Sequence, residues 1–378
     1  MRRSSQFLSP AWLAVLTPLG AFVAALAVGA VMLLALGVNP AEAYAAMFEG
    51  AFGSLNSAAD TLVKATPLLL VGVGICIAFR GGMLNIGGEG QLIVGALAAT
   101  VAVLALPAWP AWGLIPLALT LGFLAGAAWG AVPGVLKARL QVNEILTTIM
   151  MNAIAVQALN YLLRGPLMDP QQVLAGSFIP QTARFTLAAD LPRLVPTRLH
   201  AGFLLAVVVA VLAWVLLWRT TIGFRIRAVG LNPFASRRAG MRVSRYAVLA
   251  MVLSGALAGL AGAVQVMGVN HRMFTDGSSA GFTGAAGFNG IVAALFGQLH
   301  PLGTIPAAVF FGGLIVGANA MQRAVQIPSA MITALNGLLV IFVVSSDIWR
   351  RRMVQRQQKA EVASALGVGP AAEQAMPP

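Results

Sequence analysis

Long apolar runs, separated by short polar segments, make up most of this chain. An apolar stretch of about 20 residues crosses a bilayer as an α-helix. About ten runs approach that length, some of them short or broken by glycine or proline: residues 12–36, 62–79, 84–106, 112–136, 145–163, 203–218, 247–268, 282–299, 305–320 and 331–348. We therefore predict an all-α fold, a polytopic helical membrane protein with about ten transmembrane helices.

Composition agrees with this prediction. Hydrophobic residues make up 59% of the chain, charged residues only 9%, and the mean hydropathy is +0.85, whereas soluble domains are about a quarter charged. The single cysteine, Cys76, excludes an internal disulfide and any metal site built on several thiolates.

The net charge of +13 invites comparison with nucleic-acid-binding proteins, but its placement argues against that class. If the N-terminus is cytoplasmic, ten spans put most of the Lys and Arg residues on the cytoplasmic side, while several Asp and Glu residues fall on the outer side. This asymmetry follows the positive-inside rule. It predicts cytoplasmic N- and C-termini and no nucleic-acid partner.

The span pattern also defines the loops of a single membrane domain over residues 1–348. Residues 37–61 and 164–202 form external loops, and residues 219–246 form an arginine-rich inner loop. Residues 349–378 are rich in Gln, Ala, Gly and Pro, so we expect a disordered cytoplasmic tail.

The inner loop contains a short capped helix. Asn232 is a good N-cap, Pro233 suits the first helical position, and Gly240 suits the position just past the end. The residues between them include one aromatic and two cations: Phe234, Ala235, Ser236, Arg237 and Arg238. Two readings remain open, because such a helix suits both docking in a groove of another protein and lying on anionic lipid.

Glycines at four-residue spacing predict close helix packing. Gly122, Gly126, Gly130 and Gly134 share one face of the fourth span, and Gly255 and Gly259 share one face of the seventh. Small residues at this spacing let membrane helices approach backbone to backbone. We expect a tight bundle.

Two glycine-broken segments, residues 85–90 and 281–290, open the third and the eighth span. With five spans in each half, these positions correspond under inverted topology, which indicates an inverted repeat. Interrupted spans in corresponding positions point to the binding region of a transporter.

Glu89 is the only acidic residue well inside the predicted spans. A carboxylate at membrane depth is costly and usually faces a cavity, a partner or a solute path. Glu89 fits a role in solute binding or gating. It equally fits a structural role, either paired with Arg80 or accepting backbone N–H groups at a helix start.

Amides inside the spans pose the same choice. Thr148, Asn152 and Asn160 lie on one stripe of the fifth span, with Gln157 beside it. They fit solute hydroxyls or base edges along a conduit, and they also fit hydrogen bonds to neighbouring helices. Gln265, Asn289, Asn319 and Asn336 carry the same ambiguity.

An enzymatic reading has little support. Residues 277–281 match G-x-S-x-G, with Ser279 in the nucleophile position and His200, His271 and His300 as candidate bases, but the pattern lacks its strand–turn–helix context. The chain contains neither an H-E-x-x-H motif nor a phosphate-binding P-loop. We predict no enzyme, no catalytic residues, no metal and no ATP bound by this chain itself.

The run GMLNIGGEGQ at residues 82–91 resembles the signature of permease subunits of bacterial ATP-binding cassette (ABC) importers, in the branched-chain amino acid, ribose and nucleoside permease family. The similarity extends to residues 143–152, 227–233, 287–295 and 337–347, in order. The version at 82–91 is similar to the nucleoside or simple-sugar branch. It departs from the usual pattern at Gly88, where alanine is common.

This resemblance implies a multi-pass subunit of the bacterial inner (plasma) membrane. It implies three kinds of partner: a second permease, giving a heterodimer, a cytoplasmic ATPase that binds ATP and Mg²⁺, and an external substrate-binding lipoprotein or periplasmic protein. The capped helix at 232–240 then becomes the coupling helix that docks on the ATPase.

For the solute, the resemblance favours nucleosides, with simple sugars such as ribose or branched-chain amino acids as alternatives. The residues expected along the path are polar: Asn85, Glu89, Gln91, Asn152 and Asn289. An ion-coupled secondary carrier and an intramembrane serine protease are the rival classes.

Overall fold

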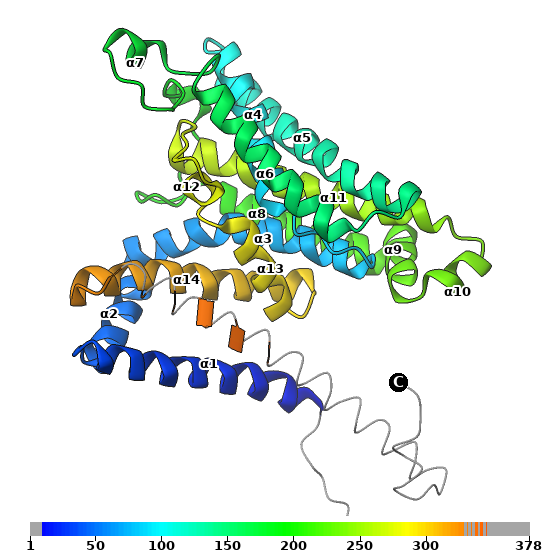
Figure 1. Ribbon diagram of the computed structural model, residues 1–378, viewed down its shortest axis with the longest axis horizontal. Coiled ribbons are helices and arrows are strands. Elements are labelled where there is room, and N and C mark those ends of the chain that lie inside the picture. Colours follow the sequence, from blue (N-terminus) through cyan, green and yellow to red (C-terminus); the bar gives the residue numbers. More distant parts are fainter. Residues whose placement is uncertain are drawn as a thin grey trace, which may run out of the picture. The chain divides into compact units, whose positions relative to one another are not determined.

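The computed structural model describes residues 10–328 and seven later positions, residues 331, 334, 337, 338, 341, 342 and 345 (Figure 1). The chain divides into two compact units, one of Met1–Tyr44 with Met321–Pro378 and the other of Ala45–Ala320. The second unit holds the features discussed below. The predicted tail at 349–378 and most of the predicted span at 331–348 lie outside the described residues.

Within the described residues, seven helices are long and apolar enough to cross a membrane. They are α3 (Leu55–Arg80), α4 (Gly88–Ala105), α5 (Ala111–Leu140), α6 (Glu144–Leu163), α8 (Gly202–Arg219), α11 (Val243–Gln265), which continues into the π-helical turn η2 (Val266–Asn270), and α14 (Pro301–Val325). Each overlaps a predicted span. Helix α1 (Pro10–Ala35) overlaps the predicted first span. The prediction of a polytopic helical membrane protein is confirmed.

The predicted eighth span at 282–299 is broken in the structure. It consists of α12 (Ser279–Thr283), two residues in the left-handed region, and α13 (Ala286–Phe296). Gly284 has φ 62° and Ala285 has φ 59°. Left-handed backbone is strained for alanine, and two such residues in succession end the first helix and redirect the second.

The structure also refines the loops. Helix α2 (Pro40–Phe52) and the first turns of α3 occupy the predicted external loop 37–61. The segment 164–202 contains α7 (Pro170–Leu174) and the 3₁₀ turn η1 (Leu187–Ala189). The inner loop folds into α9 (Thr221–Leu231) and α10 (Pro233–Arg238). Within unit Ala45–Ala320, α9 and α10 lie at one end and α7 at the opposite end (Figure 1).

Helices α4, α5 and α11 pack on their glycines, as predicted. A Cβ added at Gly95 would fall on the backbone of Gly259, and one added at Gly126 would fall on the carbonyl oxygen of Gly255. Backbones this close leave no room for a side chain, so the glycine spacing fixes the core of the bundle.

Candidate functional site

The inner helix α10 has the caps that the sequence predicts. The Asn232 side chain accepts the Ala235 N–H at 3.0 Å, Pro233 is the first helical residue, and Gly240 follows with φ 79°. Phe234 is 80% exposed, while Ser236 is buried. Arg237 and Arg238 are exposed as well. The helix therefore presents an aromatic ring and two cations at the end of the unit that holds α9.

Helix α9 connects α10 to the glycine-rich segment after α3. A Cβ at Gly230 would overlap the carbonyl oxygen of Arg80, and one at Gly82 would lie 3.0 Å from the Gly230 Cα. Gly81, Gly82, Phe234 and Arg237 also line one cavity of about 330 Å³. The backbone of α9 therefore contacts the backbone of the turn that leads into α4.

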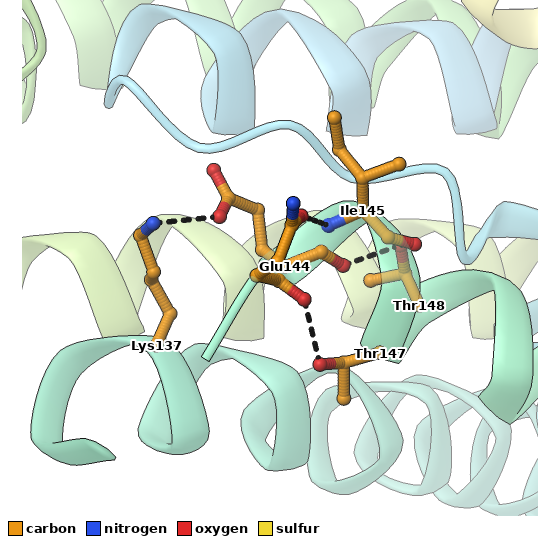
Figure 2. Close-up of polar contacts among 6 residues, drawn as sticks. Lys137, Glu144, Ile145, Thr147 and Thr148 are labelled. Carbon is orange, nitrogen blue, oxygen red and sulfur yellow. Dashed lines mark hydrogen bonds and ion pairs between the residues drawn. The ribbon is translucent and has the colours of Figure 1, made fainter. Parts of the chain in front are cut away.

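Helix α6 begins at Glu144, with Asn143 as its N-cap, and Figure 2 shows Glu144 beside Lys137 of α5. Lys137 Nζ lies 2.9 Å from Glu144 Oε2. Asn143 caps α6 by accepting the Ile145 N–H at 2.9 Å, and the Thr147 hydroxyl donates to the Asn143 carbonyl at 2.8 Å (Figure 2). Asn143 and Glu144, the first residues of the 143–152 run, therefore form the N-terminus of helix α6.

Three of the predicted path residues belong to a buried amide cluster whose members bind each other. Asn85 Nδ2 donates to Gln91 Oε1 at 2.9 Å and to Ser254 Oγ at 2.8 Å, and Asn85 Oδ1 accepts the Gly87 N–H at 2.9 Å. Asn85 is fully buried, and Gln91 and Ser254 are each 1% exposed. Sequence reasoning missed Ser254, which no motif distinguishes.

Asn152 extends this cluster to α6. It accepts the Gly90 N–H at 2.8 Å and donates to the Ile86 carbonyl at 2.9 Å. Further along the same helix, Asn160 accepts the Thr275 hydroxyl at 2.6 Å. The amides of α6 thus hold its neighbours in place, and their role in solute passage stays a prediction.

Glu89 lies where two helices begin. Its Oε1 accepts the Phe288 N–H at 3.1 Å, and a Cβ at Gly287 would overlap the Glu89 backbone N. The N-termini of α4 and α13 therefore meet at this carboxylate, which their dipoles stabilise. Arg80 donates instead to the carbonyls of Leu299 and Gln298.

The fifth predicted path residue, Asn289, is half-buried on α13, next to Phe288. Among the described residues, Glu89 Oε2 is buried without a hydrogen-bond partner. Glu89 and Asn289 thus lie at the same junction, where α4 and α13 begin. Asn85, Gln91 and Asn152 lie in the amide cluster beside it.

A cavity of about 320 Å³ is lined in part by Thr283, Gly284 and Ala286, which lie close to this junction. Its walls come from α3, from η2 with the end of α11, from α12 and the α12–α13 turn, and from α14. The polar residues that line it are Lys64, Thr66, His200, Gln265, Asn270, Thr283 and Asn319. The sequence left Gln265 and Asn319 open between the solute path and helix contacts, and it did not single out Lys64, Thr66, Asn270 or Thr283 for the path.

The histidines near this cavity differ in their environments. His271 Nδ1 lies 2.6 Å from Asp190 Oδ1. His200 is 1% exposed, and burial, together with nearby His271, lowers the pKa of His200 to about 4. His200 is therefore neutral at physiological pH.

The G-x-S-x-G match forms a helix cap. The Ser278 hydroxyl accepts the Gly281 N–H at 3.1 Å and donates to Asp276 at 2.8 Å, while Ser279 begins α12. Within the described residues, no hydrogen bond joins the Ser279 hydroxyl to a histidine, and no group of three His, Cys, Asp or Glu residues is arranged to hold a metal ion.

Comparison with known proteins identifies the family. Residues 57–344 match the family described as branched-chain amino acid transport system / permease component. The glucose ABC transporter permease protein TsgB13 of Haloferax volcanii is 37% identical over 91% of each chain. The guanosine permease NupP of Bacillus subtilis is 38% identical over 91% of this chain and 97% of its own length.

A nucleoside ABC transporter permease, NupB of Lactococcus lactis, is 33% identical over 87% of this chain and 90% of its own. No solved structure matches the chain. Family membership confirms the prediction of a multi-pass transport subunit that is not an enzyme. The chain belongs to the family of membrane-spanning permease components of ABC importers.

Proposed function

We propose that this chain is the permease of an ATP-driven nucleoside importer, with α10 as the helix through which a separate ATPase acts. The carrying observation is the backbone contact between Gly230 on α9 and Gly82 in the turn before α4. It supports a direct mechanical connection from exposed Phe234 to the buried segment 82–91.

The proposed cycle follows from this connection. Closure of the ATPase dimer pushes α10, α9 moves with it, and the Gly81–Gly82 turn carries the movement to the start of α4. There Glu89 is bonded to the start of α13, so the two broken spans move together. Packed elements of this kind switch between discrete arrangements, which gives alternating access to the two sides.

In the proposed orientation, α10 and both termini are cytoplasmic, and the segment 164–202 faces an external binding protein. ATP and Mg²⁺ belong to the partner ATPase. Helices α5, α6 and α8 leave most of their apolar surface uncovered within this chain, and that surface is available to lipid and to a second permease. The path residues of the inner half are Asn85, Glu89, Gln91, Asn152 and Asn289.

Nucleosides are the proposed solute because two of the three relatives above carry nucleoside or guanosine in their names. The name of the Haloferax relative favours a second candidate, glucose. The deciding measurement is uptake of labelled guanosine into cells that express the whole importer, with unlabelled glucose or leucine as competitor. If glucose competed with guanosine at equal concentration, glucose would replace nucleosides as the proposed solute.

The coupling role is tested by the double variant Pro233→Gly with Phe234→Asp. Loss of the helix start and of its aromatic contact should abolish uptake and release the ATPase on purification in mild detergent. Phe178→Asp is the matched control for copurification of the ATPase alone, since Phe178 is 72% exposed and follows α7, which lies at the opposite end of the unit from α10 (Figure 1). If the double variant copurified with as much ATPase as the wild type, the assignment of α10 as the coupling helix would be wrong.

A further inference from the structure

The cavity between α3, η2, α12 and α14 holds buried polar atoms that the protein leaves without partners. His200 Nε2, Gln265 Oε1 and Asn270 Nδ2 are buried and make no hydrogen bond with any described residue. All three residues line the cavity. A buried polar atom without a partner costs about 1–3 kcal/mol, so three in the wall of one cavity favour a ligand toward which these side chains turn to form the missing bonds.

Backbone irregularities occur on three walls of this space. Helix α11 ends in the π-helical turn η2, a form that is rare and frequent at functional sites. On α3, Pro67 has no N–H for the Val63 carbonyl, and both residues line the cavity. The strained Ala285, with φ 59°, lies between Gly284 and Ala286 of the same lining.

The lining also indicates the kind of ligand. Gln265 Oε1 offers an acceptor and Asn270 Nδ2 a donor, and His200 Nε2 offers a second donor because Nδ1 accepts the Gly202 N–H. The rings of Phe274 and Phe282, 6.0 Å apart and nearly perpendicular, add apolar surface for a flat group. The lining residues include a lysine, Lys64, but no carboxylate, so the ammonium group of an amino acid would find no counter-charge.

The floor of the cavity is connected to the broken spans. Thr283 and Ala286 line it, and the Thr283 side chain lies near the Glu89 carboxylate. Lys64 and Asn319 are exposed at its rim. In the proposed orientation the N-terminus of α3, and with it Lys64, lies toward the outer side. A solute held here contacts the outer face of the junction that the coupling movement displaces.

We propose that this cavity is the outer binding chamber of the permease and that it holds a neutral nucleoside, with Gln265 and Asn270 bonded to its polar groups and Phe274 and Phe282 against its base. This inference rests on the proposed function, because it assigns a chamber to the solute named there. It places the first contact with solute outside the amide cluster around Asn85.

The test uses cysteine labelling of the assembled importer in membrane vesicles. The chain has one cysteine, Cys76, which is buried, so Cys76→Ser gives a silent background. Asn270→Cys reports from the cavity wall and Lys64→Cys from its rim. Asn56→Cys is the matched control, an exposed asparagine in the first turn of α3 that does not line the cavity.

We expect a small thiol reagent to label all three cysteines, and excess guanosine to slow labelling at 270 and 64 about tenfold while leaving 56 unchanged. The same concentration of leucine should protect none of them. Unprotected labelling at 270 and 64 in an importer that still takes up guanosine would overturn the chamber and leave the proposed function intact. If the wild type took up no guanosine, the proposed function would be overturned instead. Protection of residues 270 and 64 by the solute that is transported would then decide whether the cavity is the binding chamber.

Discussion

Two polar regions in the membrane part of this chain look alike in sequence and differ in structure. Around Asn85, every amide has its partners within the protein, and Asn85, Gln91 and Ser254 exclude solvent almost completely. Around the cavity of about 320 Å³, Gln265, Asn270 and His200 each keep an atom that bonds nothing among the described residues.

Buried polar side chains are costly in free energy, and the two regions use them in different ways. Buried amides that satisfy one another stabilise a particular helix arrangement, because breaking any bond strands its partner. Amides with an unpaired atom, such as Gln265, whose Nε2 donates to the Phe282 carbonyl while its Oε1 bonds nothing among the described residues, lower stability and keep that atom available for a ligand. The two regions differ in whether their buried polar atoms have hydrogen-bond partners, more than in polarity or depth. The following variants test that distinction.

The largest effect is expected at the satisfied cluster. Asn85→Ala would leave the Gln91 side chain, the Ser254 hydroxyl and the Gly87 N–H without their partner. At about 1–3 kcal/mol for each stranded group, the free energy of unfolding should fall by about 3 kcal/mol. Thermal unfolding of the purified protein in detergent measures it, with Asn56→Ala as control; equal midpoints for the two would contradict the structural role of the cluster.

A smaller effect is expected from pH beside the cavity. Burial lowers the pKa of His200 to about 4, below the usual value of about 6.5 in an unfolded chain. The unfolded state therefore binds the proton first, and stability present above pH 6.5 is lost as the pH falls toward 4. Between pH 7.5 and 5 the loss should reach about 2 kcal/mol.

Denaturation at the two pH values measures this loss, and His200→Gln should flatten the difference. The charged groups near His200 are Lys64 at the cavity rim and the His271–Asp190 pair. These groups remain in the variant, so the difference between the variant and the wild type belongs to His200. If the stability of His200→Gln depended on pH as strongly as that of the wild type, His200 would not be the cause of the loss.

The unsatisfied cavity should respond in the opposite sense to the cluster. Asn270→Ala removes a buried amide nitrogen that bonds nothing among the described residues, so the free energy of unfolding should rise by about 1 kcal/mol. Binding of labelled guanosine to the purified importer should weaken about tenfold, the equivalent of about 1.4 kcal/mol. A destabilised variant with unchanged binding would erase the contrast between the two regions.

The smallest effect is expected at Ser279. Its backbone carbonyl accepts the Thr283 hydroxyl at 2.8 Å, and Ser278 supplies the helix cap. Ser279→Ala should therefore leave uptake and unfolding unchanged within about 0.5 kcal/mol. Loss of uptake at wild-type expression would revive a chemical role for this serine.

The sequence by itself determined the features that depend on local pattern. The apolar runs set the spans, the Asn232-Pro233 pair and Gly240 set the ends of α10, and the glycines at four-residue spacing set the packing of α5 on α11. These features follow from hydrophobic periodicity, capping and side-chain size, which can be read from neighbouring residues. The family followed from runs of such residues in order.

Only the tertiary structure decided which polar residues are satisfied. Asn85 and Ser254 are 169 positions apart and share a hydrogen bond, and Glu89 meets Phe288 across 199 positions. Gln265 and Asn270 look no different from them along the chain, yet they border open space. Whether a buried amide has a partner depends on which distant backbone folds beside it, and that is a property of the packed chain, not of any segment.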